Sequence, residues 1–156
     1  MRGKPALKRK TVSDSKYHQE KVAKFINYIM RKGKKSLAQR IVYDTFEILK
    51  KKGQNPLAIF EKVIENVSPQ VEVRSRRIGG ANYQIPFPVS GSRRFTLASR
   101  WIINAAKERK GRSMSEKLAA EFLDVLRGQG AAIKKKQDVY RMAQANKAFA
   151  HFAKYG

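Results

Sequence analysis

Residues 71–89 read Val71-Glu72-Val73-Arg74-Ser75-Arg76-Arg77-Ile78, then Gly79-Gly80-Ala81-Asn82, then Tyr83-Gln84-Ile85-Pro86-Phe87-Pro88-Val89. Two alternating runs flank a centre rich in Gly and Asn, which is the pattern of a β-hairpin. Pro86 and Pro88 lie two residues apart, so the N–H groups that they lack belong to the same side of the strand. We therefore expect a two-stranded ribbon with an open edge, which is not part of a larger sheet.

The ribbon carries arginines and aromatic side chains, and an isolated ribbon needs a surface to lie against. Arginine binds phosphates or stacks on bases, and aromatic faces stack on unpaired bases. Nucleic acid is therefore the surface that we expect for Arg74, Arg76, Arg77 and Tyr83. For Ile85 and Phe87 we favour packing at the foot of the ribbon.

The register of the two strands depends on the length of the turn between them. A four-residue turn at 79–82 would place Arg76 opposite Ile85 and Arg74 opposite Phe87. A shift by one residue would move these side chains to the other face of the ribbon.

The charge of the chain is strongly positive. Lysine and arginine number 35 against 12 acidic residues, which gives a formal net charge of +23 over 156 residues. Self-repulsion on that scale destabilises a compact monomer unless a polyanion neutralises it, so we expect a nucleic-acid partner. A membrane-surface protein is disfavoured, because no segment opposes a large apolar face to an all-basic one. We expect no membrane partner and no small-molecule substrate.

Cysteine is absent, which excludes a disulfide framework, a thiolate metal site and a catalytic thiol. The longest apolar stretches are far shorter than a membrane span, and the basic N-terminus lacks the apolar core of a signal peptide. We therefore expect a soluble cytoplasmic protein that needs no cofactor and no metal.

Helical spacing of apolar residues predicts three helices before the ribbon and three after it. Their expected buried faces are Val22, Phe25, Ile26 and Ile29; Ala38, Ile41, Val42, Thr45 and Leu49; Phe60, Val63, Ile64 and Val67; Leu97, Trp101, Ile102 and Ala105; Leu118, Phe122, Val125 and Leu126; and Val139, Met142, Ala143 and Phe149. The fold class is therefore mainly α, with a single domain of about six helices and a two-stranded β-hairpin ribbon that protrudes between the third and fourth. We assign 1–15 to a basic flexible arm, 16–150 to a helical nucleic-acid-binding domain with its ribbon at 71–89, and 151–156 to a C-terminal tail.

Four polar residues are expected to begin helices. Asn55 before Pro56 has the pattern of an N-cap followed by a first-turn proline. Ser36 and Ser113, each followed three residues later by Gln or Glu, have the pattern of a capping box. Ser92 is the expected cap of the helix that follows the ribbon.

No motif in the sequence supports catalysis. Gly33-Lys34-Lys35-Ser36 lacks the spacing of a phosphate-binding loop, and Gly128-Gln129-Gly130 follows a helix instead of a strand. His18 and His151 are the only histidines, and neither lies in a metal-binding spacing. We expect these histidines to pack or to stack on RNA, and we do not expect an enzyme.

Basic residues gather at the ends of the expected elements. Cations at the start of a helix oppose its dipole, so a bound phosphate would relieve that cost at 93–94 and at 134–136. Any single cluster could be an ordinary solvated face, and it is their repetition that favours binding. Lys107 and Arg109 share a loop cluster with two of the candidate contacts. The candidate contacts are Arg2, Lys4, Lys8, Arg9, Lys10, Arg31, Lys32, Lys34, Lys35, Arg93, Arg94, Lys110, Arg112, Lys134, Lys135 and Lys136.

Three separated blocks of sequence resemble one family. They are Arg-Ser-Arg-Arg-Ile-Gly-Gly-Ala-Asn-Tyr-Gln-Ile-Pro at 74–86, Phe-Ile-Asn-Tyr-Ile-Met at 25–30 followed by Gly-Lys-Lys at 33–35, and Gly-Ala-Ala-Ile-Lys-Lys-Lys at 130–136 with Met-Ala-Gln-Ala-Asn-Lys-Ala-Phe-Ala-His at 142–151. In this order, over nearly the whole chain, they resemble the small-subunit ribosomal protein seven family in its bacterial form.

The resemblance implies a structural ribosomal protein that binds a multi-helix junction in the 3′ major domain of small-subunit rRNA and nucleates assembly of the subunit head. It implies that the arm and the basic clusters contact rRNA, and that the ribbon lies near the exit-site tRNA and the mRNA path. Neighbouring head and platform proteins would be further partners, and some members also repress translation of their own operon's mRNA. The residues assigned to the tRNA and mRNA path are Arg74, Arg76, Arg77, Gly79, Gly80, Asn82 and Tyr83.

The chain departs from the family pattern near both ends. Residues 152–156 differ from the Tyr-Arg-Trp ending that is often seen, and the approach to the first helix at 13–21 is atypical. The alternative function is an architectural DNA-binding protein that inserts a basic β-ribbon into the minor groove. Such arms usually serve dimers, and no strong dimer seam is visible here. An enzyme acting on RNA is a distant third.

Overall fold

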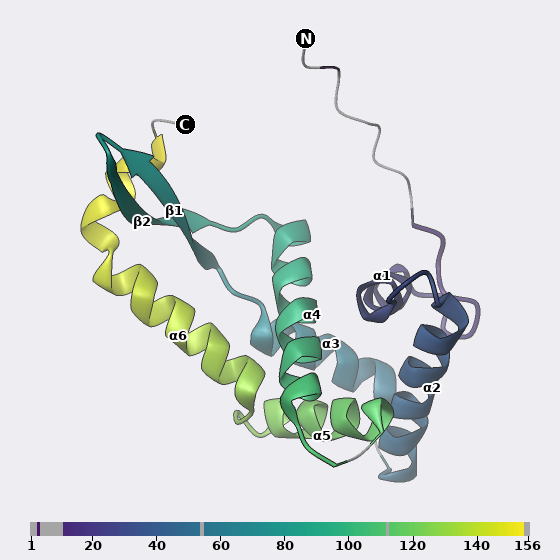
Figure 1. The fold of residues 1–156 in the computed structure, drawn as a ribbon. Coiled ribbons are helices and arrows are strands. Elements are labelled where there is room, and N and C mark those ends of the chain that lie inside the picture. The colour runs from purple at the N-terminus through teal and green to yellow at the C-terminus, as the bar shows by residue number, and fades with distance from the viewer. Residues whose placement is uncertain (1–2, 4–10, 54, 112, 155–156) are drawn as a thin grey trace. The chain divides into compact units, whose positions relative to one another are not determined.

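The computed structural model describes residues 3, 11–53, 55–111 and 113–154 (Figure 1). The chain forms two compact units, residues 1–42 and 43–156. Within the described residues there are six α-helices, a two-stranded antiparallel sheet and a 3₁₀ helix: α1 (Glu20–Ile29), α2 (Lys35–Lys51), α3 (Pro56–Val67), β1 (Val71–Ile78), β2 (Ala81–Pro88), α4 (Gly91–Glu108), α5 (Met114–Leu126), α6 (Ala131–Ala145) and η1 (Lys147–Lys154). The mainly α fold class with a ribbon between the third and fourth helices is confirmed. The domain boundaries expected at 15 and 150 remain predictions.

The first unit contains α1 and the beginning of α2. The predicted apolar face of α1 is buried: Val22, Phe25, Ile26 and Ile29 are each at most 8% exposed. Before the helix, the Asp14 carboxylate accepts hydrogen bonds from the N–H groups of Lys16 and Tyr17, at 3.1 and 3.0 Å, and closes a turn. A carboxylate that binds backbone donors two and three residues ahead is a common way to lead a chain into a helix.

The start of α2 differs from the prediction. The helix begins at Lys35, so Ser36 lies inside its first turn and is not the N-cap. The preceding turn explains the difference, because Lys32 and Gly33 both have positive φ, at 52° and 72°. These angles reverse the chain within two residues, and Lys34 N–H already donates to Arg31 O at 3.1 Å. Helical geometry therefore starts one residue before the serine.

The core of the second unit is built on three phenylalanines from three helices. Phe46 of α2, Phe60 of α3 and Phe122 of α5 are each at most 1% exposed. The rings of Phe46 and Phe60 lie 5.9 Å apart, and those of Phe60 and Phe122 lie 6.3 Å apart, in tilted arrangements. Aromatic pairs in this range add to the free energy of burial. Helical spacing predicted Phe60 and Phe122, whereas Phe46 was missed.

The predicted N-caps of α3 and α5 are confirmed. The side chain of Asn55 accepts from Leu57 N–H at 3.1 Å, with Pro56 in the first turn, and the side chain of Ser113 accepts from Glu116 N–H at 3.4 Å. These caps depend only on residues within one helical turn, which explains why sequence patterns found them.

The prediction that Ser92 caps α4 is wrong. The helix begins at Gly91 and its N-cap residue is Ser90, which has extended backbone angles. Val89 N–H donates to Gln70 O at 3.0 Å, so the hydrogen bonding of the ribbon extends to residue 89. The helix therefore starts as soon as the ribbon ends, and Ser92 falls within its first turn.

The turn of the ribbon has two residues, not four. Gly79 and Gly80 have φ values of 56° and 88°, which suit the two-residue turns preferred in hairpins. The register therefore pairs Arg74 with Ile85 and Arg76 with Tyr83. A four-residue turn, one of the registers that the sequence left open, would have shifted these partners by two residues and kept the side chains on the same faces.

The ribbon lies against the C-terminal part of its own chain. Strand β1 contacts α6 and strand β2 contacts η1, as the ribbon diagram also shows (Figure 1). The rings of Tyr83 and Phe149 lie 5.1 Å apart, and Gln70 N–H donates to Tyr140 Oη at 2.9 Å. Protein thus supplies part of the surface that was expected to be nucleic acid, and it contacts Tyr83.

The inner face of α6 is narrower than predicted. Ala132 and Val139 are buried, whereas Met142 is 44% exposed. Phe149 lies beyond the end of α6, in η1, where it contacts Tyr83. The expectation of one continuous apolar stripe from Val139 to Phe149 is therefore wrong, because the chain changes from α to 3₁₀ geometry after Ala145.

Replacing Asn55 by Ala tests the cap of α3. The change removes the acceptor of Leu57 N–H, and we expect it to lower the free energy of unfolding by about 1 kcal/mol. Urea unfolding followed by circular dichroism measures the change. The matched control is Asn104→Ala, an exposed position within α4, which should cost nothing because Ala favours helix. Equal destabilisation by the two variants would contradict the capping role.

Candidate nucleic-acid interface

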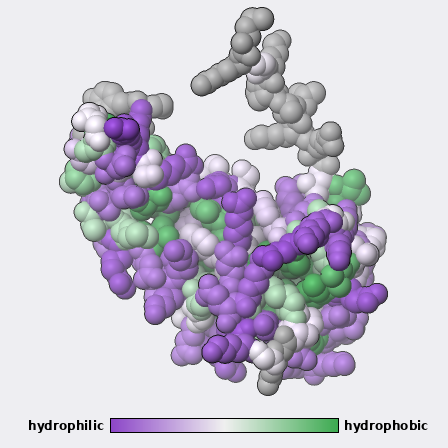
Figure 2. Space-filling view, in the orientation of Figure 1, coloured by the Kyte–Doolittle hydropathy of each residue, from purple (hydrophilic) through white to green (hydrophobic). Residues whose placement is uncertain are grey.

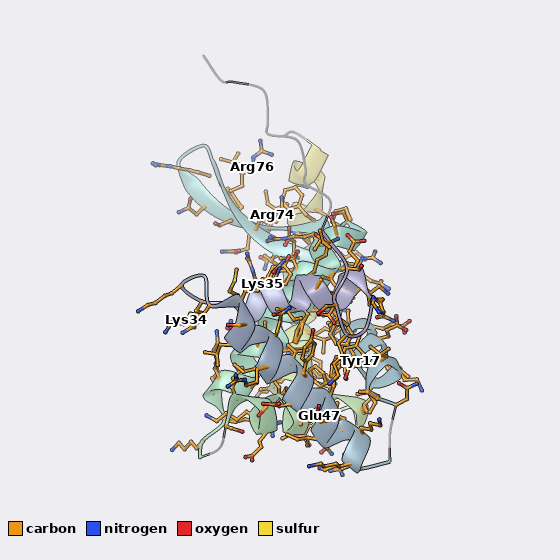
Figure 3. All side chains as sticks on the ribbon, turned by 90° about the vertical axis from the view of Figure 1, so that its right-hand side faces the viewer. Tyr17, Lys34, Lys35, Glu47, Arg74 and Arg76 are labelled. Carbon is orange, nitrogen blue, oxygen red and sulfur yellow. The ribbon has the colours of Figure 1, made fainter. Side chains whose placement is uncertain are left out.

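The turn between α1 and α2 presents four exposed cations. Arg31, Lys32, Lys34 and Lys35 surround Gly33 within five residues. Figure 3 shows Lys34 and Lys35 on this turn. A compact group of exposed cations on a short, hydrogen-bonded turn can meet adjacent phosphates at little cost in backbone order.

Six predicted contacts lie outside the described residues. These six are Arg2, Lys4, Lys8, Arg9, Lys10 and Arg112. The structure does describe Lys110, which follows α4 and is exposed.

The arginines at the start of α4 have partners inside the protein. Arg93 Nε donates to Glu72 Oε2 at 3.1 Å, and Arg94 Nε donates to the carbonyl oxygen of Val89 at 3.1 Å. The sequence analysis expected a phosphate to offset the positive charge at this helix N-terminus. In the structure a carboxylate from β1 lies next to Arg93 and supplies negative charge there.

Glu72 is the centre of this arrangement. It is buried, with 8% of its side chain exposed, and it also accepts hydrogen bonds from Arg74. Burial acts to raise the pKa of Glu72, but the hydrogen bonds and charges of Arg74 and Arg93 outweigh it and lower the pKa below its usual value. Glu72 is therefore a buried anion that binds one arginine from β1 and one from α4. No sequence pattern had indicated a role for this residue.

The ribbon divides its predicted contacts between its faces and its tip. Arg74 and Arg76 share one face with Tyr83, and Figure 3 shows Arg76 further along the ribbon than Arg74. The guanidinium of Arg74 lies 5.4 Å from the ring centre of Phe87, a cation–π contact on that face. Arg77 is exposed on the opposite face. The tip residues Gly79, Gly80 and Asn82 are also exposed.

The three lysines at the start of α6 have different surroundings. Lys134 and Lys135 are exposed and line an open groove of about 370 Å³ between α4 and α6, together with Trp101 and Asn104. Figure 2 shows hydrophilic residues over much of α4 and α6 on one face of this unit. Lys136 instead donates from Nζ to Asn66 O, at 2.7 Å, in the last turn of α3, and burial lowers its pKa. Lys136 thus binds the carbonyl end of a helix, as lysines commonly do.

The start of α6 is held by a second buried carboxylate. Glu121 of α5 is fully buried, and its Oε1 accepts from Ala132 N–H at 3.1 Å. Arg109 donates to Glu121 at 2.6–2.9 Å and also binds Asp124. Burial acts to lower the pKa of Arg109, but the hydrogen bonds and charges of Asp124 and Glu121 outweigh it and raise the pKa above its usual value. This arginine, grouped in the sequence with a solvent-facing basic loop, therefore has an internal role.

The two buried carboxylates share one function in the fold. Glu72 lies beside the first turn of α4, and Glu121 binds the first turn of α6. The starts of α4 and α6 are the places where a bound phosphate was expected from the sequence. Negative charge at these ends offsets the helix dipole and the charge of the neighbouring cations. The exposed basic side chains can therefore lie at these helix starts without a bound phosphate. Sequence spacing places Glu121 and Asp124 on one side of a helix, but it gives no sign of their arginine partner.

The comparisons with known proteins agree with this picture. Residues 1–147 match the family described as ribosomal protein S7p/S5e. The chain belongs to this family. It is 54% identical over 149 residues to the small ribosomal subunit protein uS7 of Francisella tularensis subsp. holarctica (strain OSU18), with 94% of this chain and 95% of that protein covered. The small ribosomal subunit protein uS7 of F. tularensis subsp. novicida (strain U112) is 53% identical over the same shares of each chain.

Membership of the S7p/S5e family confirms the resemblance seen in the sequence. The chain is a protein of the small ribosomal subunit, a cytoplasmic RNA-binding ribonucleoprotein component that acts in translation. The family consists of structural ribosomal proteins, so the expectation that the chain is not an enzyme is confirmed.

Two kinds of feature are absent from the described residues. No group of three His, Cys, Asp or Glu residues among them could hold a metal ion. Across the same described part of the chain, no helix has the length and apolar character needed to cross a membrane.

Replacing Gly130 by Ala tests how Glu121 fixes the start of α6. Gly130 has φ 111° and ψ 154°, which side chains rarely adopt, and an added Cβ would lie 3.0 Å from Glu121 Oε1. We expect a loss of about 1–3 kcal/mol of unfolding free energy from backbone strain alone, and more from the displaced carboxylate. Urea unfolding measures it.

The matched control is Gly128→Ala. Gly128 also has positive φ, at 75°, but an added Cβ would meet open space. This variant should lose only roughly 1–2 kcal/mol of unfolding free energy. Equal losses in both variants would show that the contact with Glu121 does not matter.

Proposed function

We propose that this chain binds a multi-helix junction in the 3′ major domain of small-subunit rRNA and nucleates assembly of the subunit head. The observation that carries the proposal is the separation of charge. The carboxylates Glu72 and Glu121 are buried and bind arginines of the same chain, whereas Lys34, Lys35 and Lys134 are exposed at the ends of helices. A surface of this kind binds a folded polyanion through phosphates and shape more than through individual bases.

The basic clusters would supply the rRNA contacts. The exposed turn between α1 and α2 and the start of α6 meet phosphates with the least rearrangement, because their lysines face solvent. Arg93, Arg94 and Lys136 would have to share or give up internal partners. The proposed rRNA contacts outside these two groups are Arg2, Lys4, Lys8, Arg9, Lys10, Lys110 and Arg112.

The ribbon would serve a different partner. We assign its arginines and exposed tip to the exit-site tRNA and the mRNA path, with Gly79, Gly80 and Asn82 nearest to it. Support comes from the packing of β2 on η1, which holds Tyr83 and restricts the movement of the ribbon. The neighbouring head and platform proteins complete the proposed set of partners. Repression of its own operon's mRNA would use the same rRNA-binding surface on a similar RNA junction.

Competition binding tests the proposed function. A labelled fragment of the 3′ major domain, folded with Mg²⁺, is bound by the purified chain and challenged with unlabelled duplex DNA. We expect the unlabelled fragment to displace the label at far lower concentration than duplex DNA at the same salt. If duplex DNA displaces the label equally well, the architectural DNA-binding alternative is the better account.

Lys134→Gln with Lys135→Gln tests the start of α6. Each phosphate contact releases counterions, so the slope of log K against log salt for the rRNA fragment should flatten by about 1.4–1.8 when two contacts are lost. Filter binding between low and moderate salt measures the slope.

The matched control is Lys50→Gln with Lys62→Gln. These exposed lysines lie on α2 and α3, away from the proposed contacts, and their replacement removes the same amount of positive charge. The control should change the slope much less. A slope that is equal in the two double variants would assign Lys134 and Lys135 to an ordinary solvated face.

A further inference from the structure

Glu72 restrains two arginines from separate elements at the base of the ribbon. Its Oε1 accepts from both Nε and Nη2 of Arg74, and its Oε2 accepts from Nε of Arg93 at 3.1 Å. The carboxylate is 8% exposed, while the side chains of Arg74 and Arg93 are 56% and 41% exposed. Both guanidinium groups therefore reach solvent although one edge of each is bound to a buried anion.

The hydrogen bonds to Glu72 limit how a phosphate can approach these arginines. A guanidinium binds an oxyanion in a fork, either side-on through Nε and one Nη or end-on through both Nη groups. Side-on binding to Arg74 or Arg93 would compete with Glu72, because Glu72 already uses both Nε groups. End-on approach leaves the Nε bonds in place. Phosphates are thus favoured from one direction at each arginine.

Phe87 restrains Arg74 further. The guanidinium lies 5.4 Å from the centre of the Phe87 ring, and Phe87 is the cross-strand partner of Glu72. A carboxylate on one edge and an aromatic ring on one face leave Arg74 little freedom to follow a phosphate. A restrained arginine loses less entropy on binding a matching phosphate, and it gains less from a phosphate in the wrong place.

The local charge points the same way. Two guanidinium groups and one carboxylate sum to +1, so this site attracts a generic polyanion less than two unpaired arginines would. Non-specific binding to nucleic acid rests on charge alone, whereas selective binding requires charges at fixed positions. Glu72 therefore weakens non-specific binding and supports selective binding.

We propose that Glu72 is a specificity-determining residue, which holds Arg74 and Arg93 so that they bind only RNA phosphates of matching position and direction, those of rRNA at Arg93 and those of the tRNA and mRNA path at Arg74. The role rests on the proposed RNA-binding function and adds a named residue to it. Glu72 touches no RNA in this account and acts through the two arginines, so it is a positioning residue.

Glu72→Gln tests the role in the full-length chain. The amide keeps the shape of the side chain but loses the charge that holds the arginines. Affinity is measured for the folded rRNA fragment and for a duplex RNA of equal length, over a range of salt. We expect duplex affinity to rise about 3- to 10-fold at low salt, with a steeper salt slope, because the arginines can now follow any phosphate. Affinity for the fragment should not rise in step, so the ratio of the two affinities falls.

The matched control is Glu65→Gln. Glu65 is an exposed residue of α3, and its replacement changes the net charge by the same amount. This variant should raise both affinities equally and leave their ratio unchanged. A merely structural role for Glu72 would lower the melting temperature without changing the ratio.

A second variant keeps the proposal open to refutation if Glu72→Gln fails to fold. Phe87→Leu removes the ring beside Arg74 and leaves Glu72 in place, so the ratio should fall in the same direction by a smaller factor. Equal ratios in the wild type and in the folded variants would overturn the role of Glu72 while the wild type still prefers the rRNA fragment. A wild-type chain without that preference would contradict the proposed function itself, and the role of Glu72 with it.

Discussion

The fold must accommodate a large excess of positive charge, and two buried carboxylates are central to how it does so. Glu72 lies beside the start of α4 and Glu121 binds the start of α6, each with an arginine partner. Negative charge at these helix starts offsets the dipole and lets exposed basic side chains cluster nearby. The carboxylates thus lie at the starts of the two helices that follow or contact the ribbon. At these helix starts a protein carboxylate supplies the negative charge that the sequence pattern assigned to phosphate.

The ribbon depends on the C-terminal part of the chain. Two strands alone are marginally stable, and here α6 and η1 cover part of the ribbon. The contact between Tyr83 and Phe149 joins β2 to η1, and the hydrogen bond from Gln70 to Tyr140 joins the foot of the ribbon to α6. A partner that bound the ribbon would therefore bind a segment that α6 and η1 already hold in place. Pre-organisation of this kind reduces the entropy lost on association.

Sequence patterns predicted those features that depend on near neighbours. The apolar stripes of the first five helices follow the helical period, and the caps at Asn55 and Ser113 act within one turn. Four residues of the predicted stripes are only half-buried, namely Ile41, Leu97, Trp101 and Leu126. Ser36 and Ser92 have equally good local patterns but do not cap helices. Their helices begin earlier because a tight turn and the extended hydrogen bonding of the ribbon decide the boundaries. The sequence left the length of the ribbon's turn open, and in the structure two adjacent glycines complete the reversal within two residues.

The mainly α class, the ribbon between the third and fourth helices, the family and the excess of positive charge could all be inferred from the amino-acid sequence. Which cations bind partners within the protein depends on the tertiary structure. Arg93 pairs with a residue 21 positions away, Arg109 with one 12 positions away, and Lys136 with a carbonyl 70 positions away. Lys134 and Lys135, adjacent to Lys136, remain exposed. Periodicity and local propensity act over a few residues, whereas such pairings depend on how whole helices pack against each other.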